Sequence, residues 1–185
     1  MVSRKYTSDY RLEDTLDPKT GRMATRSVYQ GQWFRFCAGA AAVKRTAWIY
    51  TLLTALCALG FVLPLLFDPP AMRAAYVAVP FVALVFSLFY LAAGCRRVFT
   101  AKDRVTREHR DKIVERLRGA SVSACALSGV SLVGIIVSWC LRGFAAADLT
   151  CACASALLLS VNLIMLLRLH GRLAMEPVEQ QEATS

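Results

Sequence analysis

The class of this protein is decided by a run of 22 residues without a charged side chain, residues 46–67: TAWIYTLLTALCALGFVLPLLF. At 1.5 Å per residue a helix of this length is about 33 Å long, which matches the ~30 Å hydrocarbon core of a bilayer. Further runs at 74–95, 119–141 and 149–167 also lack Asp, Glu, Lys, Arg and His. Because lipid offers no partners for backbone polar groups, such runs cross it as helices. The sequence therefore predicts an all-α integral membrane protein with transmembrane helices at 46–67, 74–95, 119–141 and 149–168.

The composition of the whole chain supports this class. Hydrophobic residues make up 56% of the 185 residues and the mean hydropathy is +0.45, whereas an ordinary soluble domain is about 45–50% apolar. Outside the four runs, about 100 residues remain in separate pieces, which leaves no room for a further catalytic domain of ~100–150 residues. The sequence excludes a water-soluble globular protein.

Two short segments join the predicted helices in pairs. Segment 68–73 begins Asp-Pro-Pro, which forms a rigid, non-helical turn. Segment 142–148 ends at Asp148, which we expect to cap the N-terminus of the fourth helix. The sequence thus predicts two hairpins with tight outer turns.

The 22 Lys and Arg residues are distributed very unevenly. Nine precede the first predicted helix, nine lie between the second and third, two follow the fourth, and only Arg73 and Arg142 lie in the outer turns. By the positive-inside rule, segments 1–45, 96–118 and 169–185 are cytoplasmic. We therefore expect a multi-pass protein of the plasma (cell inner) membrane with both termini in the cytoplasm.

Several of these basic residues fall at predicted membrane boundaries. Lys and Arg at such positions reach anionic lipid headgroups and contribute about 1 kcal/mol each. The candidate headgroup contacts are Lys44, Arg45, Arg96, Arg97, Arg116 and Arg118. This role accounts for the net charge of +9, and no nucleic-acid-binding motif accompanies it, so the expected partners are membrane lipids and not nucleic acid.

The N-terminal segment has the pattern of a small β structure. Apolar and polar residues alternate from residue 10, DPKTG at 17–21 supplies a turn, and an aromatic-rich run follows at 28–36. This pattern predicts a β-hairpin over 10–36, and the alternative is an irregular juxtamembrane tail. The aromatic residues before Lys44 predict an interfacial segment over 33–45, with a short helix from residue 37 to 43 lying at the headgroups.

The segment 96–118 is rich in charges of both signs. Four residues at four-residue steps predict one face of an amphipathic helix that continues into the third transmembrane helix: Val105, His109, Ile113 and Leu117. This helix is either a docking surface or a solvated connector on the membrane. The tail from residue 175 onward is acidic and contains a proline, which predicts disorder.

Ionisable residues inside a membrane mark ion paths and active sites, and the four apolar runs contain none. The strongest polar side chain at depth is Asn162, and the third run carries Ser128 and Ser131. One interpretation is packing, because small and polar residues let membrane helices approach and add hydrogen bonds of about 0.6 kcal/mol. The other is a solute pathway lined by these three residues.

Three of the seven cysteines lie near the second outer turn: Cys140, Cys151 and Cys153. If the outer face is oxidising, Cys140 is placed to form a disulfide with one of the other two, whereas the alternative is that all three serve as small apolar residues. We find no catalytic triad, phosphate loop, dinucleotide fingerprint or metal-ligand spacing. The sequence therefore predicts no enzyme, no cofactor and no metal.

Two functions remain open at this point. The first is a non-enzymatic accessory or scaffold subunit of a membrane complex, acting through a protein partner or self-association. The second is an oligomeric channel or transporter whose uncharged pathway suits a neutral or lipid-like solute.

Overall fold

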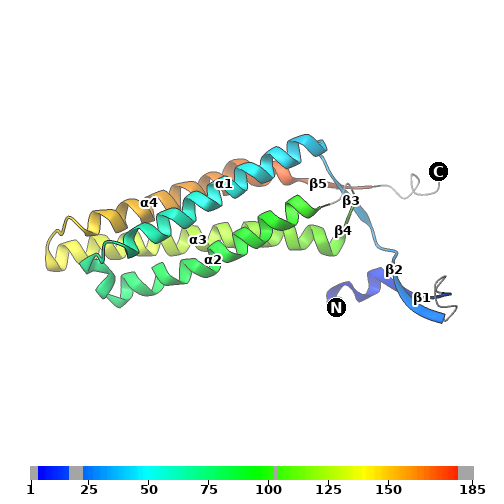
Figure 1. Ribbon diagram of the computed structural model, residues 1–185, viewed down its shortest axis with the longest axis horizontal. Coiled ribbons are helices and arrows are strands. Elements are labelled where there is room, and N and C mark those ends of the chain that lie inside the picture. Colours follow the sequence, from blue (N-terminus) through cyan, green and yellow to red (C-terminus); the bar gives the residue numbers. More distant parts are fainter. Residues whose placement is uncertain (1–3, 17–22, 102–103, 179–185) are drawn as a thin grey trace.

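The computed structural model describes residues 4–16, 23–101 and 104–178, and most of them are helical. Figure 1 shows a bundle of long helices: α1 (Ala40–Leu65), α2 (Ala75–Thr100), α3 (Arg107–Arg142) and α4 (Asp148–Ile164), which a π-helical turn, η3 (Met165–Leu169), and a 3-10 turn, η4 (His170–Leu173), continue. All four helices, with the last counted to Leu169, are long and apolar enough to cross a membrane. The prediction of four such helices is confirmed.

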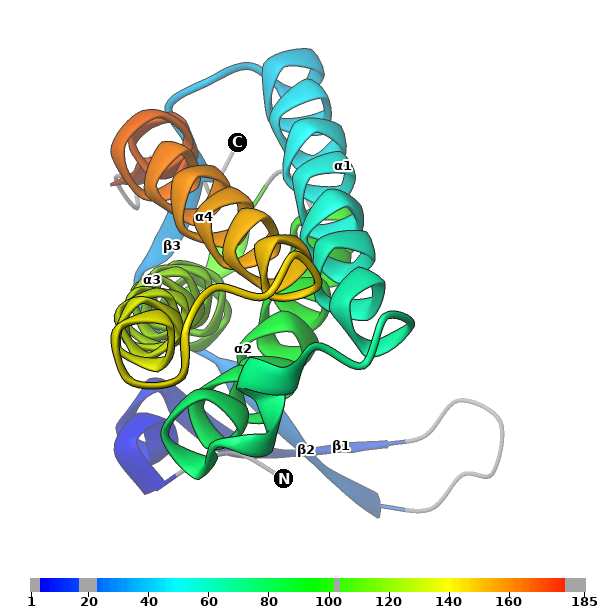
Figure 2. The ribbon, with the colours of Figure 1, turned by 90° about the vertical axis from the view of Figure 1, so that its left-hand side faces the viewer.

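Neighbouring helices in the bundle are also neighbours along the chain, apart from α1 and α4, whose contact closes the bundle. Figure 2 looks along the bundle and shows the four helices around a common axis. The α1–α2 turn and the α3–α4 turn both lie at one end, which we call the turn end. The other end, the basal end, carries all the short strands.

The bundle exposes large apolar side chains and buries small polar ones. On its outer surface, Leu52 is 70% exposed and Phe89 69% exposed, whereas Ser128 and Asn162 are completely buried inside. A water-soluble bundle has the opposite distribution, because its large apolar residues supply the core. The arrangement is the one expected of helices that face hydrocarbon.

Two glycines allow α2 and α3 to approach closely. A Cβ atom on Gly94 would lie 2.6 Å from Cδ2 of Leu117, and one on Gly134 would lie 3.0 Å from Cγ2 of Val77. These distances are shorter than normal van der Waals contacts, and Leu117 is itself buried. Glycine at these positions therefore sets the spacing of the two helices.

The turn end contains η2 (Pro70–Arg73), a 3-10 turn between α1 and α2. The predicted capping role of Asp148 is wrong, because α4 begins at this residue and Ala147 occupies the N-cap position. The Asp148 carboxylate instead accepts a hydrogen bond of 2.7 Å from the backbone N–H of Ala71, in the other turn, and is 3% exposed. The first N–H groups of a helix have no partner within the helix itself. The tertiary fold brings the Asp148 carboxylate within hydrogen-bonding distance of one of these groups in η2.

At the basal end, a 3-10 turn, η1 (Arg4–Asp9), leads into a ribbon of two antiparallel strands, β1 (Tyr10–Leu16) and β2 (Met23–Tyr29). The predicted turn residues 17–21 lie outside the described residues. The predicted second strand, 28–36, is wrong in its extent, because β2 ends at Tyr29 and a separate strand, β3 (Trp33–Phe36), belongs to another sheet. β3 is not part of the ribbon because both of its edges pair with other strands of a second sheet.

The second sheet has the order β4-β3-β5, with β4 (Val105–Thr106) and β5 (Met175–Pro177) both antiparallel to β3. It joins three distant parts of the chain: the N-terminal segment, the α2–α3 connection and the residues after α4. The predicted disorder of the tail is therefore wrong for β5, since pairing with β3 satisfies its backbone groups. Residues 179–185 lie outside the described part of the chain.

The predicted boundaries of the charged helix need correction. Residues 96–100 belong to α2, and Val105, predicted on the helix face, lies in β4. The helix begins at Arg107 and runs without interruption into the third apolar segment, as predicted. No separate helix occupies residues 37–43, because α1 begins at Ala40 and continues directly into the first apolar segment.

Candidate functional site

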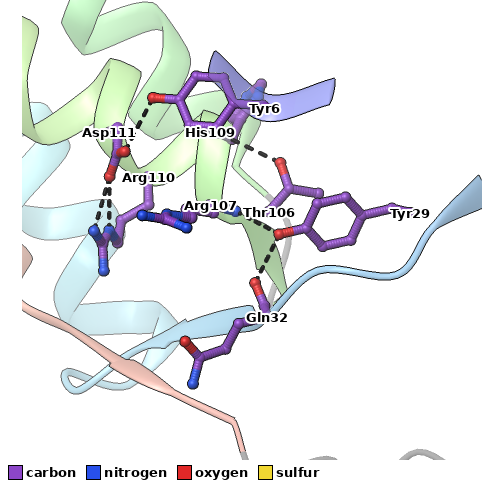
Figure 3. A network of polar contacts seen from close by, with 8 residues as sticks. All are labelled: Tyr6, Tyr29, Gln32, Thr106, Arg107, His109, Arg110 and Asp111. Carbon is purple, nitrogen blue, oxygen red and sulfur yellow. Dashed lines mark hydrogen bonds and ion pairs between the residues drawn. The ribbon is translucent and has the colours of Figure 1, made fainter. Parts of the chain in front are cut away.

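The most elaborate polar arrangement lies at the basal end, where η1, the ribbon and β3 meet the first turns of α3. We call these elements the basal assembly. Its polar side chains come from segments about 100 residues apart in the sequence, and Figure 3 shows how they converge on α3. α3 begins with Thr106 as its N-cap, whose hydroxyl accepts a hydrogen bond of 3.4 Å from the His109 N–H.

The buried centre of this assembly is a tyrosine–carboxylate–arginine cluster. The Tyr6 hydroxyl donates to Asp111 Oδ2 at 3.0 Å, and Arg110 donates to Oδ1 of the same carboxylate through Nε at 3.0 Å and Nη2 at 2.8 Å. The Arg110 guanidinium lies over the Phe34 ring, 4.2 Å from its centre. Tyr6, Phe34 and Asp111 are all less than 9% exposed. The cluster therefore fixes η1 and β3 to α3.

A second contact holds the start of the ribbon to α3. The Tyr10 hydroxyl donates to Glu108 Oε2 at 3.4 Å, and the other oxygen of Glu108 pairs with Lys112 one helical turn later. Burial, followed by the negative charge of Glu108, raises the pKa of Tyr10 above its ordinary value of 10.0. The phenol therefore remains a neutral donor over the physiological pH range.

The end of β2 makes the third contact. The Tyr29 hydroxyl accepts a hydrogen bond of 3.0 Å from the Arg107 N–H and donates one of 2.8 Å to the Gln32 carbonyl. Its ring packs edge-on against Tyr10 and Trp33, with centroid distances of 5.2 and 5.0 Å. Burial raises the pKa of Tyr29 as well. Because three tyrosines hold the ribbon, it emerges from a fixed base.

Beyond this base the ribbon leaves the bundle, and both views show it clear of the helices. Leu12 is 72% exposed and Met23 is 75% exposed, although both are large and apolar. In a two-stranded sheet each strand also has one edge without a sheet partner. The ribbon thus exposes apolar side chains, and each of its strands has backbone hydrogen-bonding groups along one edge without a sheet partner.

The three residues predicted to pack or to line a pathway all lie in the bundle interior. Ser128, Ser131 and Asn162 are completely buried. Asn162 Nδ2 donates to the Leu158 carbonyl at 2.8 Å and lies 3.6 Å from Sγ of Cys57 on α1. Within the described residues, Ser131 Oγ and Asn162 Oδ1 have no hydrogen-bond partner. These two buried groups therefore keep unused hydrogen-bonding capacity inside the bundle.

The three cysteines at the turn end do not share one surface. All seven cysteines of the chain are free thiols in the structure; Cys151 is buried, whereas Cys140 and Cys153 are exposed. Cys151 and Cys153 are two residues apart on α4, which places them on different faces of that helix. The disulfide stays a prediction.

All six candidate headgroup residues lie towards the basal end. Lys44, Arg45, Arg96 and Arg118 are exposed, and Arg97 and Arg116 are half-buried. The buried Nη1 of Arg97 has no partner among the described residues. The basal half of the bundle therefore carries cations on α1, α2 and α3.

The described residues contain no group of three or more His, Cys, Asp or Glu side chains arranged to hold a metal ion. The chain was compared with protein-family models, curated proteins and solved structures, and none of them matches it. Its own geometry is therefore the basis for any functional proposal.

Sequence analysis did not find the basal assembly. Tyr6 and Asp111 are 105 positions apart, and nothing in either segment indicates the other. The one available signal was the concentration of tyrosines and carboxylates in two segments predicted to lie on the same side of the membrane. That signal indicates proximity but not which residues pair.

Proposed function

We propose that this chain is a non-enzymatic accessory or scaffold subunit of a membrane complex, and that the ribbon β1–β2 docks its protein partner. The observation that carries the proposal is the ribbon itself: it lies outside the bundle and exposes Leu12 and Met23 by more than 70%. An isolated two-stranded ribbon is marginally stable in water. The three tyrosine contacts with α3 supply the support that such a ribbon needs.

In the proposed topology, the chain crosses the plasma membrane four times, with both termini and the basal assembly in the cytoplasm. The distribution of Lys and Arg supports this orientation. The length of α3 is compatible with it, because 36 residues correspond to about 54 Å, considerably more than the ~30 Å hydrocarbon core. The charged first turns of α3 then stand in the cytoplasm and carry the ribbon away from the lipid.

The test is co-purification of the full chain from its native membranes in mild detergent, followed by native mass spectrometry. We expect a second protein in a fixed ratio with the wild type. The double variant Leu12→Ser/Met23→Ser should lose this protein by at least tenfold, since two large apolar contacts are removed. The matched control is Leu66→Ser, which changes an equally exposed leucine near the turn end.

A wild-type chain that carries no second protein would contradict the scaffold proposal. Retention of the partner by the double variant would contradict the assignment of the ribbon. Loss of the partner in the Leu66 control as well would show a general effect of the substitution and would also overturn the assignment.

A second function is favoured by a separate observation: within the described residues, the buried oxygens Ser131 Oγ and Asn162 Oδ1 have no hydrogen-bond partner. In this alternative the chain forms an oligomeric channel or transporter for a neutral or lipid-like solute. Its test is uptake of uncharged solutes by reconstituted vesicles. The double variant Ser131→Ala/Asn162→Leu should abolish the flux, whereas Ser160→Ala, on the exposed side of α4, should leave it unchanged.

A further inference from the structure

A groove of about 460 Å³ lies between α1 and α2 in the basal half of the bundle. Its α1 wall consists of Thr51, Thr54, Ala55 and Ala58, and its α2 wall includes Leu88, Ala92 and Cys95. Residues three and four apart share one face of a helix, so each wall is a continuous stripe. The groove is hollow because most of these residues are small, whereas neighbouring surface residues such as Leu52 and Phe89 are large.

The basal end of the groove has a different chemical character. Arg96 and Phe99 line it there, and the Phe99 ring packs edge-on against Trp48 of α1 at 5.4 Å. Lys44 lies one turn before Trp48, on the same stripe of α1 as Thr51. Arg96 of α2 therefore lines the basal end of the groove, and the exposed Lys44 of α1 lies further along the same direction, beyond Trp48.

No carboxylate on either helix neutralises these cations, because α1 and α2 contain no Asp or Glu. Within the part of the chain that the structure describes, the Arg96 guanidinium makes no ion pair. The groove thus combines an apolar trough with a positive charge at one end. An anionic amphiphile has the complementary arrangement, with a hydrocarbon chain attached to a negatively charged headgroup.

We propose that this groove is a binding site for one anionic phospholipid, with an acyl chain along the small residues of α1 and α2 and the headgroup phosphate at Arg96 and Lys44. The volume lies within the 300–1,000 Å³ typical of small-molecule sites. A partner helix of ~10 Å diameter fills roughly 420 Å³ with each turn, so the groove would take only about one turn of it. A flexible hydrocarbon chain fills such a trough along its length.

The proposal is independent of the ribbon and of the interior polar residues, and it is tested separately. The full chain is purified in mild detergent and equilibrated with equal amounts of phosphatidylglycerol and phosphatidylcholine that have the same acyl chains. Native mass spectrometry then measures how many lipids remain bound and of which class. We expect one retained lipid per chain, enriched in phosphatidylglycerol.

Two variants separate the contributions of the trough and of the charge. Ala55→Phe/Ala92→Phe fills the trough and should remove the retained lipid of either class, whereas the control Ala126→Phe, on the exposed surface of α3, should retain it. Arg96→Gln should keep a bound lipid but lower the ratio of phosphatidylglycerol to phosphatidylcholine by about fivefold. Its control is Arg142→Gln, an exposed arginine at the turn end of α3.

Several outcomes would overturn the proposal. One is undiminished lipid on the Ala55→Phe/Ala92→Phe variant, and another is equal loss on the Ala126 control. A third is a wild-type dimer mass that disappears in the filled variant, because it would identify a second copy as the occupant. The surface substitution Arg96→Gln keeps the proposal testable if the filled variant does not fold, and an unchanged lipid ratio in that variant would also contradict it.

Discussion

The turn end and the basal end close the same four helices with different chemistry. At the turn end, the buried Asp148 carboxylate links the two turns by accepting a hydrogen bond from the Ala71 N–H, and the ion pair between Asp68 and Arg73 is largely exposed. At the basal end, a three-stranded sheet and three tyrosine contacts connect segments from the whole length of the chain.

The difference follows from the lengths of the connections. Short turns already restrict where their helices go, so one well-placed hydrogen bond is enough to fix the two hairpins against each other. The N-terminal segment has no such restriction and must be held by many weak contacts. We infer that the turn end depends strongly on a single residue, whereas the basal end loses its order in small steps.

The largest expected effect is at Asp148. Asp148→Ala removes the acceptor for the buried Ala71 N–H and should destabilise the protein by about 2–3 kcal/mol. Asp68→Ala is the matched control, because it breaks an exposed ion pair and should change stability by less than about 1 kcal/mol. Thermal unfolding in detergent measures both. Equal effects of the two substitutions would refute the special role of the turn-end carboxylate.

The next effect concerns the bundle between the two ends. Gly94→Ala places a Cβ atom 2.6 Å from Leu117 and should cost about 1–3 kcal/mol, since two packed helices must separate. Gly119→Ala meets nothing within 4 Å and should instead stabilise α3 by up to about 1 kcal/mol. We expect the unfolding temperature of Gly94→Ala to be lower than that of the wild type and the unfolding temperature of Gly119→Ala to be higher. A loss of stability in both would show that the close approach at Gly94 is not the cause.

A smaller effect is expected for the tyrosine cluster. Tyr6→Phe removes one hydrogen bond to Asp111, worth about 0.5–1.5 kcal/mol, while Arg110 keeps its contacts with the carboxylate. We expect faster amide hydrogen exchange in η1 and β1 and little change in the helices. Thr25→Ala removes an exposed hydrogen bond to Asp14 and should leave η1 unaffected. Global destabilisation by Tyr6→Phe would contradict the stepwise character of the basal end.

The smallest effect is the pH dependence of the same region. The raised pKa values of Tyr10 and Tyr29 mean that their unfolded forms ionise near pH 10 while the folded forms keep their protons. Their contribution to stability is complete below pH 10 and is lost as the pH rises through the folded pKa. A titration followed by tyrosinate absorbance should therefore show phenols that ionise only above pH 10. The variant Tyr10→Phe/Tyr29→Phe should show fewer such phenols than the wild type. Identical curves for both proteins would exclude this linkage.

Predictions from the sequence were most reliable where they followed from one physical requirement, the exclusion of charged side chains from hydrocarbon. Four uncharged runs of about 20 residues predicted four long apolar helices, and the structure contains them. The interior positions of Ser128, Ser131 and Asn162 follow from the same reasoning, since polar side chains in such helices avoid the apolar surroundings. The continuity of the charged segment with the third helix was also predicted correctly.

Predictions that depended on local patterns were less successful. Asp148 has the sequence signature of an N-cap but binds a different turn, and β3 looks like the second half of a hairpin but pairs with β4 and β5. In both cases a polar or backbone group found a better partner in a distant segment. The local conformational preference of a residue contributes less free energy than a buried hydrogen bond.

By itself, the sequence determined the number and the apolar character of the helices, because the cost of placing charges and unpaired backbone in hydrocarbon leaves few alternatives. Only the tertiary structure decided how the two ends are closed, which tyrosine meets which carboxylate, and where small residues of α1 and α2 leave a groove beside Arg96. These features depend on the relative rotation and spacing of packed helices. No single helix encodes either quantity, because both arise from side chains that meet only when the bundle forms.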